Sequence, residues 1–226
     1  MRVVVVRHHE EDSAGFIGAA FEARGATLST LLYPKEGVLP DLAGVAHIVM
    51  LGSTSSVYDE GEARAWIDEE LTWLRRADAA GVPVLGICFG AQMLAATFGG
   101  TVEHAGRQEI GWVTVDSADP ALIPPGPWLE FHHDRCKPPD GATVLARNDL
   151  GVQAFRFGRH LGVQFHPEVD GDQFRLWLDA GGRAEITADG QDPDLMLAQT
   201  IAEEPEASAR ADWLVASALR IAGASA

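Results

Sequence analysis

Cys88 lies in a segment whose residue types favour a nucleophilic thiolate. An apolar run at residues 82–87 precedes it and a helical pattern at about 90–98 follows, so the sequence predicts a sharp strand-to-helix turn at the cysteine. Gly86 and Gly90 stand two residues to either side and leave room for neighbouring backbone. The unpaired N–H groups and dipole of the helix N-terminus favour the thiolate, the reactive form of cysteine. The alternative is a buried core cysteine, because free cysteines are commonly buried.

A second segment, residues 162–169, supplies the base that a cysteine nucleophile needs. Its apolar and polar side chains alternate as on a strand with one buried face, and Pro167 ends the strand. His166 and Glu168 are two residues apart, so their side chains leave an extended chain on the same side and can meet. An imidazole oriented by a carboxylate is the general base of such sites. The alternative is a solvent-exposed strand end.

The first hundred residues have the pattern of a doubly wound α/β domain with a mostly parallel sheet. Continuous apolar runs, rich in β-branched residues, predict strands buried on both faces, and helical spacing of apolar residues predicts the helices between them. The strands are expected at 3–6, 27–33, 45–51 and 82–87, and the helices at 13–24, 60–80 and 90–98.

After Gly100 the pattern changes to short strands that form a small antiparallel part. They are expected at 111–115, 128–132, 143–147, 152–157 and 160–165, the last two joined by a tight hairpin at Gly158-Arg159. Residues from 170 onward have a helical pattern, and the acidic cluster at 203–206 is interpreted as a linker between two helices. We therefore divide the chain into an α/β domain at 1–170 and a helical C-terminal extension at 171–226, packed on the same domain.

The composition restricts the partners and the compartment. Seventeen basic and thirty-three acidic residues give a formal charge of −16, which disfavours nucleic acid and anionic membrane surfaces as partners. The first apolar run is too short for a signal peptide or a membrane span, so we expect a cytoplasmic protein. The two cysteines, Cys88 and Cys136, are then both thiols.

Together the two segments resemble a known family. GICFGAQ at 86–92 and GVQFHPE at 162–168 are similar to the elbow and base motifs of the class I (triad-type) glutamine amidotransferases, which have a flavodoxin-like fold. The stretch Glu-Ile-Gly-Trp at 109–112 resembles stand-alone, GMP-synthase-like members. The resemblance implies that Cys88 attacks the side-chain amide carbon of glutamine, that His166 carries protons and that Glu168 orients His166. Glutamate and ammonia would form through a glutamyl thioester.

The developing oxyanion should be bound by backbone N–H groups, one of them from Phe89, the residue after the nucleophile. The resemblance implies that the second comes from the loop after the third strand, at Gly52 or Ser53. Many relatives begin that loop with Gly-Gly-Pro, whereas this chain has Gly-Ser-Thr. Gln92 matches a family glutamine that lines the substrate pocket.

Two further clusters contain residue types that bind ligands. His132 and Asp134 resemble the family's His-x-Asp segment beside the substrate pocket, and the resemblance implies no metal and no cofactor there. His8, His9, Glu10 and Glu11 also have the side chains of metal ligands, but we interpret them as a solvated strand end.

Three functions remain open. The first is a glutamine amidotransferase (glutaminase) subunit; because no ATP-binding loop is evident, its acceptor domain would be a separate synthetase protein. The second is a hydrolase of γ-glutamyl peptides or γ-glutamyl amines, which would use the same triad. The third is a non-enzymatic binding or regulatory relative. A homodimer is also compatible with the sequence.

The C-terminal helical pattern has two interpretations. Residues 195–221 could form a helical pair that covers the site or docks a partner subunit, and so gates entry of the substrate and release of ammonia. Alternatively, their apolar residues pad the outer face of the sheet, because apolar residues at helical spacing must bury against something.

Overall fold

A computed structural model describes residues 1–224 of the chain and contains two β-sheets. The main sheet has eight strands. The first five strands in its spatial order pair in parallel, and each of the remaining three pairs antiparallel to its neighbour. Their order across the sheet is β2 (Thr27–Leu32), β1 (Arg2–Arg7), β3 (Val45–Met50), β4 (Val84–Ile87), β10 (His160–Val163), β9 (Val152–Phe157), β8 (Thr143–Arg147) and β6 (Asp116–Ser117). The second sheet is an antiparallel pair, β5 (Thr101–Val113) and β7 (Trp128–Lys137). The α/β class with a mostly parallel sheet is confirmed.

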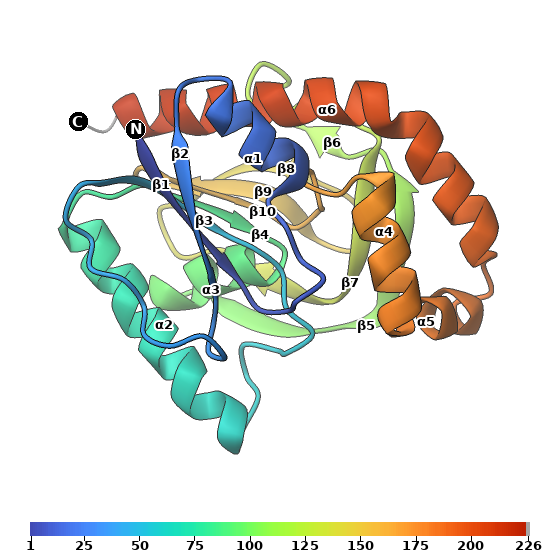
Figure 1. Cartoon of the computed structure of the whole chain (residues 1–226), viewed down its shortest axis with the longest axis horizontal. Coiled ribbons are helices and arrows are strands. Elements are labelled where there is room, and N and C mark those ends of the chain that lie inside the picture. The colour runs from blue at the N-terminus through green and yellow to red at the C-terminus, as the bar shows by residue number, and fades with distance from the viewer. Residues whose placement is uncertain (225–226) are drawn as a thin grey trace.

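Helices cover both faces of the main sheet, with α1 (Gly15–Glu22) and α6 (Pro193–Gly223) on one side and α2 (Glu62–Ala79) and α3 (Phe89–Thr97) on the other (Figure 1). The four consecutive valines of β1 explain why both faces need a cover. Val3 and Val5 belong to the core under α1 and α6, and Val4 and Val6 to the core under α2 and α3. A continuous apolar strand thus places alternate side chains in two separate cores.

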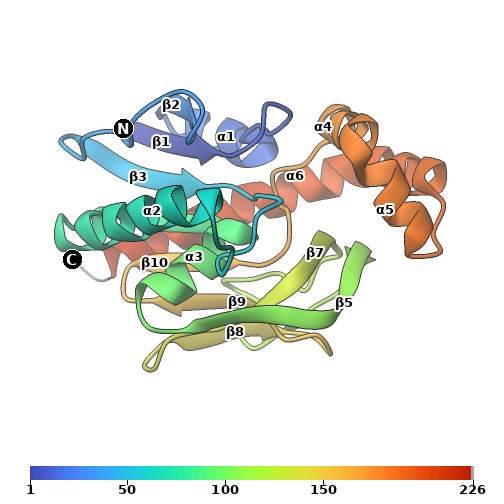
Figure 2. The same cartoon turned by 90° about the horizontal axis from the view of Figure 1, so that it is seen from below.

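The strands of the second sheet are longer than predicted. The strand expected at 111–115 is the end of β5, which begins at Thr101, and the strand expected at 128–132 continues to Lys137. Residues 101–109 are mostly polar and half-buried or exposed, so they carry no apolar pattern that marks a strand. Their strand conformation comes from pairing with β7, which crosses the end of the molecule beside β5 (Figure 2).

The predicted linker at residues 203–206 is wrong, because α6 continues without interruption through Pro205. A proline inside a helix removes one backbone hydrogen bond and crowds the preceding turn. Here Pro205 itself is exposed, whereas Thr200 before it and Ala207 and Ala211 after it are buried. Burial of that face therefore holds the helix together across the proline.

The helical pair expected at 195–221 is likewise a single helix, and most of it does not cover the site. Buried residues of α6 such as Leu214 and Val215 lie in the core formed with α1 and the sheet, as the padding interpretation expected. The segment nearest the site is the one before it, made of α4 (Gly171–Trp177), a π-helical turn (Leu178–Gly182) and α5 (Arg183–Ala188). Among the described residues, no helix combines the length and apolar character needed to cross a membrane.

Candidate active site

Cys88 lies at the turn between β4 and α3 in a backbone conformation that few side chains adopt. Its φ of 53° is the only positive value of a non-glycine residue in the described chain. The flanking glycines are required by close backbone contacts. A Cβ on Gly86 would lie 2.4 Å from the carbonyl oxygen of Gly90, and a Cβ on Gly90 would lie 2.2 Å from that of Met50. Strain of this kind persists only where the surroundings hold it, and it is concentrated at functional sites.

His166 and Glu168 follow the end of β10, the strand that pairs with β4. Nδ1 of His166 lies 2.8 Å from Oε1 of Glu168, and both side chains are buried. The edge of the His166 ring packs against the Trp177 ring, with ring centroids 4.9 Å apart. Burial alone would lower the pKa of His166, but the charges of Glu168 and Cys88 raise it well above its ordinary value.

The structure brings the predicted triad together. Because β4 and β10 are neighbouring parallel strands, their carboxyl ends meet at one edge of the sheet, where α/β proteins commonly bind ligands. There His166 and Cys88 line the same cavity, the charge of Cys88 raises the pKa of His166, and Nε2 of Gln164 lies 3.5 Å from the Cys88 sulfur. Cys88, His166 and Glu168 thus lie together at this edge, in the order that a thiol nucleophile, its base and an orienting carboxylate would need.

The loop after β3 approaches the triad at Gly52. A Cβ there would lie 3.1 Å from Cε1 of His166 and 3.8 Å from Cβ of Cys88, so a larger residue would crowd both side chains. Ser53 lines the space around Cys88. Phe89 is the first residue of α3, and its N–H is one of those without an intrahelical partner.

His8 corrects an expectation, because it is not part of a solvated strand end. Its side chain is only 2% exposed, with Nδ1 2.8 Å from the carbonyl oxygen of Gly52 and Nε2 3.1 Å from Glu70. Burial lowers its pKa, but Glu70 and the Gly52 carbonyl outweigh this effect and the pKa is raised. His8 therefore anchors the loop that the oxyanion hole would use. His9, in contrast, is half-buried beside Thr54.

Two cavities meet at Cys88. The first, of about 310 Å³, is lined by Gln92, His132 and Asp134, the three residues predicted to contact the substrate. The second, of about 410 Å³, lies on the side of His166 and is lined by residues that include Trp177 and Glu185. Nothing in the sequence marked Trp177 as part of the site, because its helix follows the base motif by several residues.

The polar groups of the first cavity are held by further side chains. The carboxylate of Asp134 accepts hydrogen bonds from the hydroxyls of Ser56 (2.5 Å) and Tyr58 (2.7 Å). Nε2 of Gln92 donates to Oε1 of Gln164 at 3.2 Å. Ser56 and Tyr58 were missed, because the resemblance gave that loop a role only through its backbone.

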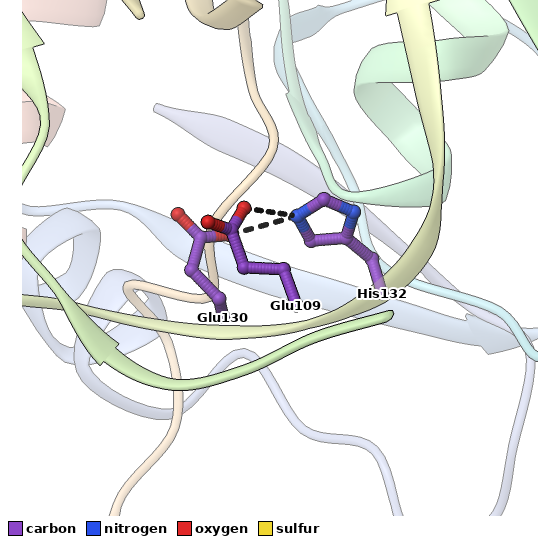
Figure 3. Close-up of side chains that lie close together, drawn as sticks. All are labelled: Glu109, Glu130 and His132. Carbon is purple, nitrogen blue, oxygen red and sulfur yellow. Dashed lines mark hydrogen bonds and ion pairs between the residues drawn. The ribbon is translucent and has the colours of Figure 1, made fainter. Parts of the chain in front are cut away.

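His132 lies in a cluster that the sequence analysis missed, with Glu109 and Glu130 (Figure 3). Its Nδ1 is 2.8 Å from the backbone carbonyl oxygen of Asp134, and its Nε2 is 3.0 Å from Glu109 and 3.2 Å from Glu130. The carbonyl oxygen of Asp134 and Oε2 of Glu109 each accept a hydrogen bond from the ring, so the ring carries both protons. Burial lowers the pKa of His132, but the two glutamates outweigh it and raise the pKa to about 10. In this arrangement no ring N–H remains for a substrate.

Comparison with known proteins gives matches in sequence and in structure. The family model for glutamine amidotransferase class-I matches residues 17–177. The GMP synthase [glutamine-hydrolyzing] of Streptomyces avermitilis is 40% identical over 135 residues, which are 55% of this chain and 24% of that protein. The protein of the same name from Leifsonia xyli is 36% identical over 162 residues, 65% of this chain and 31% of its own length. The chain thus matches less than a third of either relative.

Solved structures match over nearly the whole chain. A glutamine amidotransferase from Thermotoga maritima superposes with a TM-score of 0.87 at 27% identity and covers 98% of both chains. A glutamine amidotransferase from Methylobacillus flagellatus superposes with a TM-score of 0.86 at 23% identity, over 97% of this chain and 94% of its own; at that identity the match shows the fold alone.

Proposed function

The chain belongs to the class I glutamine amidotransferase family, and on that premise we propose that it hydrolyses the side-chain amide of glutamine through a cysteinyl thioester. Cys88 is the nucleophile, His166 the proton carrier and Glu168 the residue that orients His166. The observation that carries the proposal is the buried His166–Glu168 pair, whose imidazole lines the same cavity as Cys88 at the junction of two cavities.

We propose the following reaction for these groups. The Cys88 thiolate adds to the amide carbon, and the negative charge on the former carbonyl oxygen is bound by the N–H of Phe89 and of Gly52 or Ser53. The C–N bond then breaks while protonated His166 gives its proton to the leaving nitrogen, which departs as ammonia. Neutral His166 next takes a proton from water, whose oxygen attacks the thioester; glutamate leaves and the thiol is restored.

Incubation of the purified chain with glutamine tests the proposal directly. We expect equal amounts of glutamate and ammonia, and we expect Cys88→Ala to abolish both while its circular dichroism stays that of the parent chain. A chain that folds but releases no ammonia from glutamine or from any γ-glutamyl amide would favour the third alternative, a binding or regulatory relative.

A second candidate is hydrolysis of γ-glutamyl amides with a larger leaving group, and the second cavity favours it. That cavity, of about 410 Å³ and lined by His166, lies where the leaving nitrogen receives its proton, and ammonia does not need that volume. Kinetics on glutamine and on γ-glutamyl alkylamides of increasing size separate the two. A kcat/KM that rises with amine size identifies the amide hydrolase, and one that falls identifies the glutaminase.

We also infer a synthetase as the partner of the glutaminase reaction, in the reducing cytoplasm, where Cys88 remains a thiol. This inference is supported by the relatives that match, which are named GMP synthase [glutamine-hydrolyzing]. Co-purification from the native host, with ammonia transfer measured as product formation from glutamine, checks this inference. A chain that remains uncomplexed and hydrolyses γ-glutamyl amines would exclude it.

A further inference from the structure

The register of the second sheet places three metal-binding side chains on one face. Glu109 in β5 is the direct partner of His132 in β7, and Glu130 lies two residues before His132 on the same face. One ligand atom from each of the three lies within 4.8 Å of the other two. Figure 3 shows both carboxylates directed at the same nitrogen, Nε2 of His132.

The groups around the cluster orient it as the surroundings of a metal site do. Nδ1 of His132 donates to the carbonyl oxygen of Asp134, which leaves Nε2 facing the carboxylates. Asn148 donates to Oε1 of Glu109 at 2.7 Å, and Gln153 donates to Oε2 at 3.0 Å. A histidine fixed through its other nitrogen and a carboxylate fixed by amides are the usual second layer around a protein-bound metal.

Glu130 is the observation that points to a ligand. Its side chain has no exposed surface, and neither carboxylate oxygen has a partner that meets hydrogen-bond geometry. Its nearest neighbour is Nε2 of His132, whose single N–H is already directed at Glu109. The fully buried Glu130 and the partly buried Glu109 therefore face one N–H donor, and a buried carboxylate without a full set of partners is costly.

We propose that Glu109, Glu130 and His132 bind a divalent transition metal, with zinc as the first candidate. One imidazole nitrogen and two carboxylate oxygens suit Zn²⁺, which binds such atoms at about 2.0–2.2 Å, whereas Ca²⁺ and Mg²⁺ prefer oxygen ligands throughout. The metal takes the place of the Nε2 proton, which is released, and its two charges balance the two carboxylates. The ion would tie β5 to β7 behind the wall of the first cavity. This site is independent of the proposed hydrolase function.

The test measures retained metal rather than activity. The chain carrying Cys88→Ala is used, so that the active-site thiolate cannot capture zinc. After chelation, incubation with ZnSO₄ and desalting, we expect one zinc per chain by mass spectrometry, with a higher melting temperature than the metal-free chain. Co²⁺ in its place should give the visible absorption of a protein-bound ion.

Glu130→Gln, added to Cys88→Ala, should lose the retained metal and the shift in melting temperature. Two matched controls should keep both: Glu103→Gln removes an exposed carboxylate of the same strand, and His133→Asn removes a half-exposed histidine of the same wall. Equal retention in the Glu130→Gln chain, or no metal retained before it is introduced, overturns the proposal. Where Glu130→Gln fails to fold, ¹⁵N-histidine NMR decides on the Cys88→Ala chain: Zn²⁺ must shift the Nε2 signal of His132, and an unchanged imidazolium signal refutes the site.

Discussion

Replacing Glu168 by Gln tests how the buried carboxylate acts on His166. The amide oxygen of Gln can still accept the Nδ1–H hydrogen bond now made at 2.8 Å, so the ring orientation is kept and only the negative charge is lost. The charge of Glu168 sets the direction in which the pKa of His166 shifts. A carboxylate beside the ring stabilises the imidazolium and raises its pKa, so its removal lowers that pKa. The ring then loses its proton at a lower pH.

The size of the shift in the pKa of His166 follows from the change in its hydrogen bond with residue 168. A hydrogen bond to a charged group contributes about 1.5–3 kcal/mol and a neutral one about 1 kcal/mol. The difference of roughly 0.5–2 kcal/mol corresponds to about one pKa unit, at 1.36 kcal/mol per unit. Screening by solvent is weak, because the Glu168 side chain is only 2% exposed.

The assay is the pH profile of kcat/KM for glutamine, whose alkaline limb reports, on the proposed mechanism, loss of the proton that His166 would give to the leaving nitrogen. We expect the midpoint of this limb to shift to lower pH by about one unit in Glu168→Gln. Alkylation of Cys88 by iodoacetamide at alkaline pH is the control, because a thiolate needs no proton donor to be alkylated. An unmoved alkaline limb with intact alkylation would refute a charge effect of Glu168 and leave it a purely structural role.

Three further outcomes are expected. Iodoacetamide should label Cys88 and spare Cys136, whose pKa burial raises to about 12; peptide mapping showing label mainly on Cys136 would contradict the assigned nucleophile. Gly90→Ala should lower the free energy of unfolding by about 1–3 kcal/mol through its clash with a backbone carbonyl, whereas Gly223→Ala, in open space, should change it little in thermal melts. Pro205→Ala should raise the free energy of unfolding by about 1 kcal/mol or more, because it restores a helix hydrogen bond. A lower melting temperature would contradict this.

The elbow and the base motif could be predicted from the sequence because their geometry is local. Gly86 and Gly90 are each two residues from Cys88, and their requirement for space appears as a spacing in the chain. His166 and Glu168 meet because they are two residues apart in extended backbone. The meeting of the two segments was inferred from the family resemblance, and the parallel pairing of β4 with β10 provides it physically.

The features that could not be predicted from the sequence depend on contacts between distant segments. Glu109 lies 23 residues before His132 and meets it only through the register of a strand that has no apolar pattern in its first half. His8 is polar at a strand end, and its burial depends on Glu70 of α2, 62 residues away. Continuity of α6 through Pro205 was also hidden, because local propensity argues for a break and only the buried face of the helix overrides it.

The separation of the molecule into two sheets assigns chemistry and selectivity to different parts of the chain. Cys88 is held by the main sheet through β4 and β10, and His166 follows β10 and hydrogen-bonds to Leu129 of β7. The walls of the cavities come from elsewhere. β7 contributes His132 and Asp134, and the segment after the base motif contributes Trp177 and Glu185. This second unit has its own apolar core, built from β5, β7 and the helices that follow the base motif. Substitutions in that core are therefore expected to act on the second cavity and on His166, whose N–H donates to the carbonyl oxygen of Leu129 and whose ring packs on Trp177, while Cys88 stays fixed by β4.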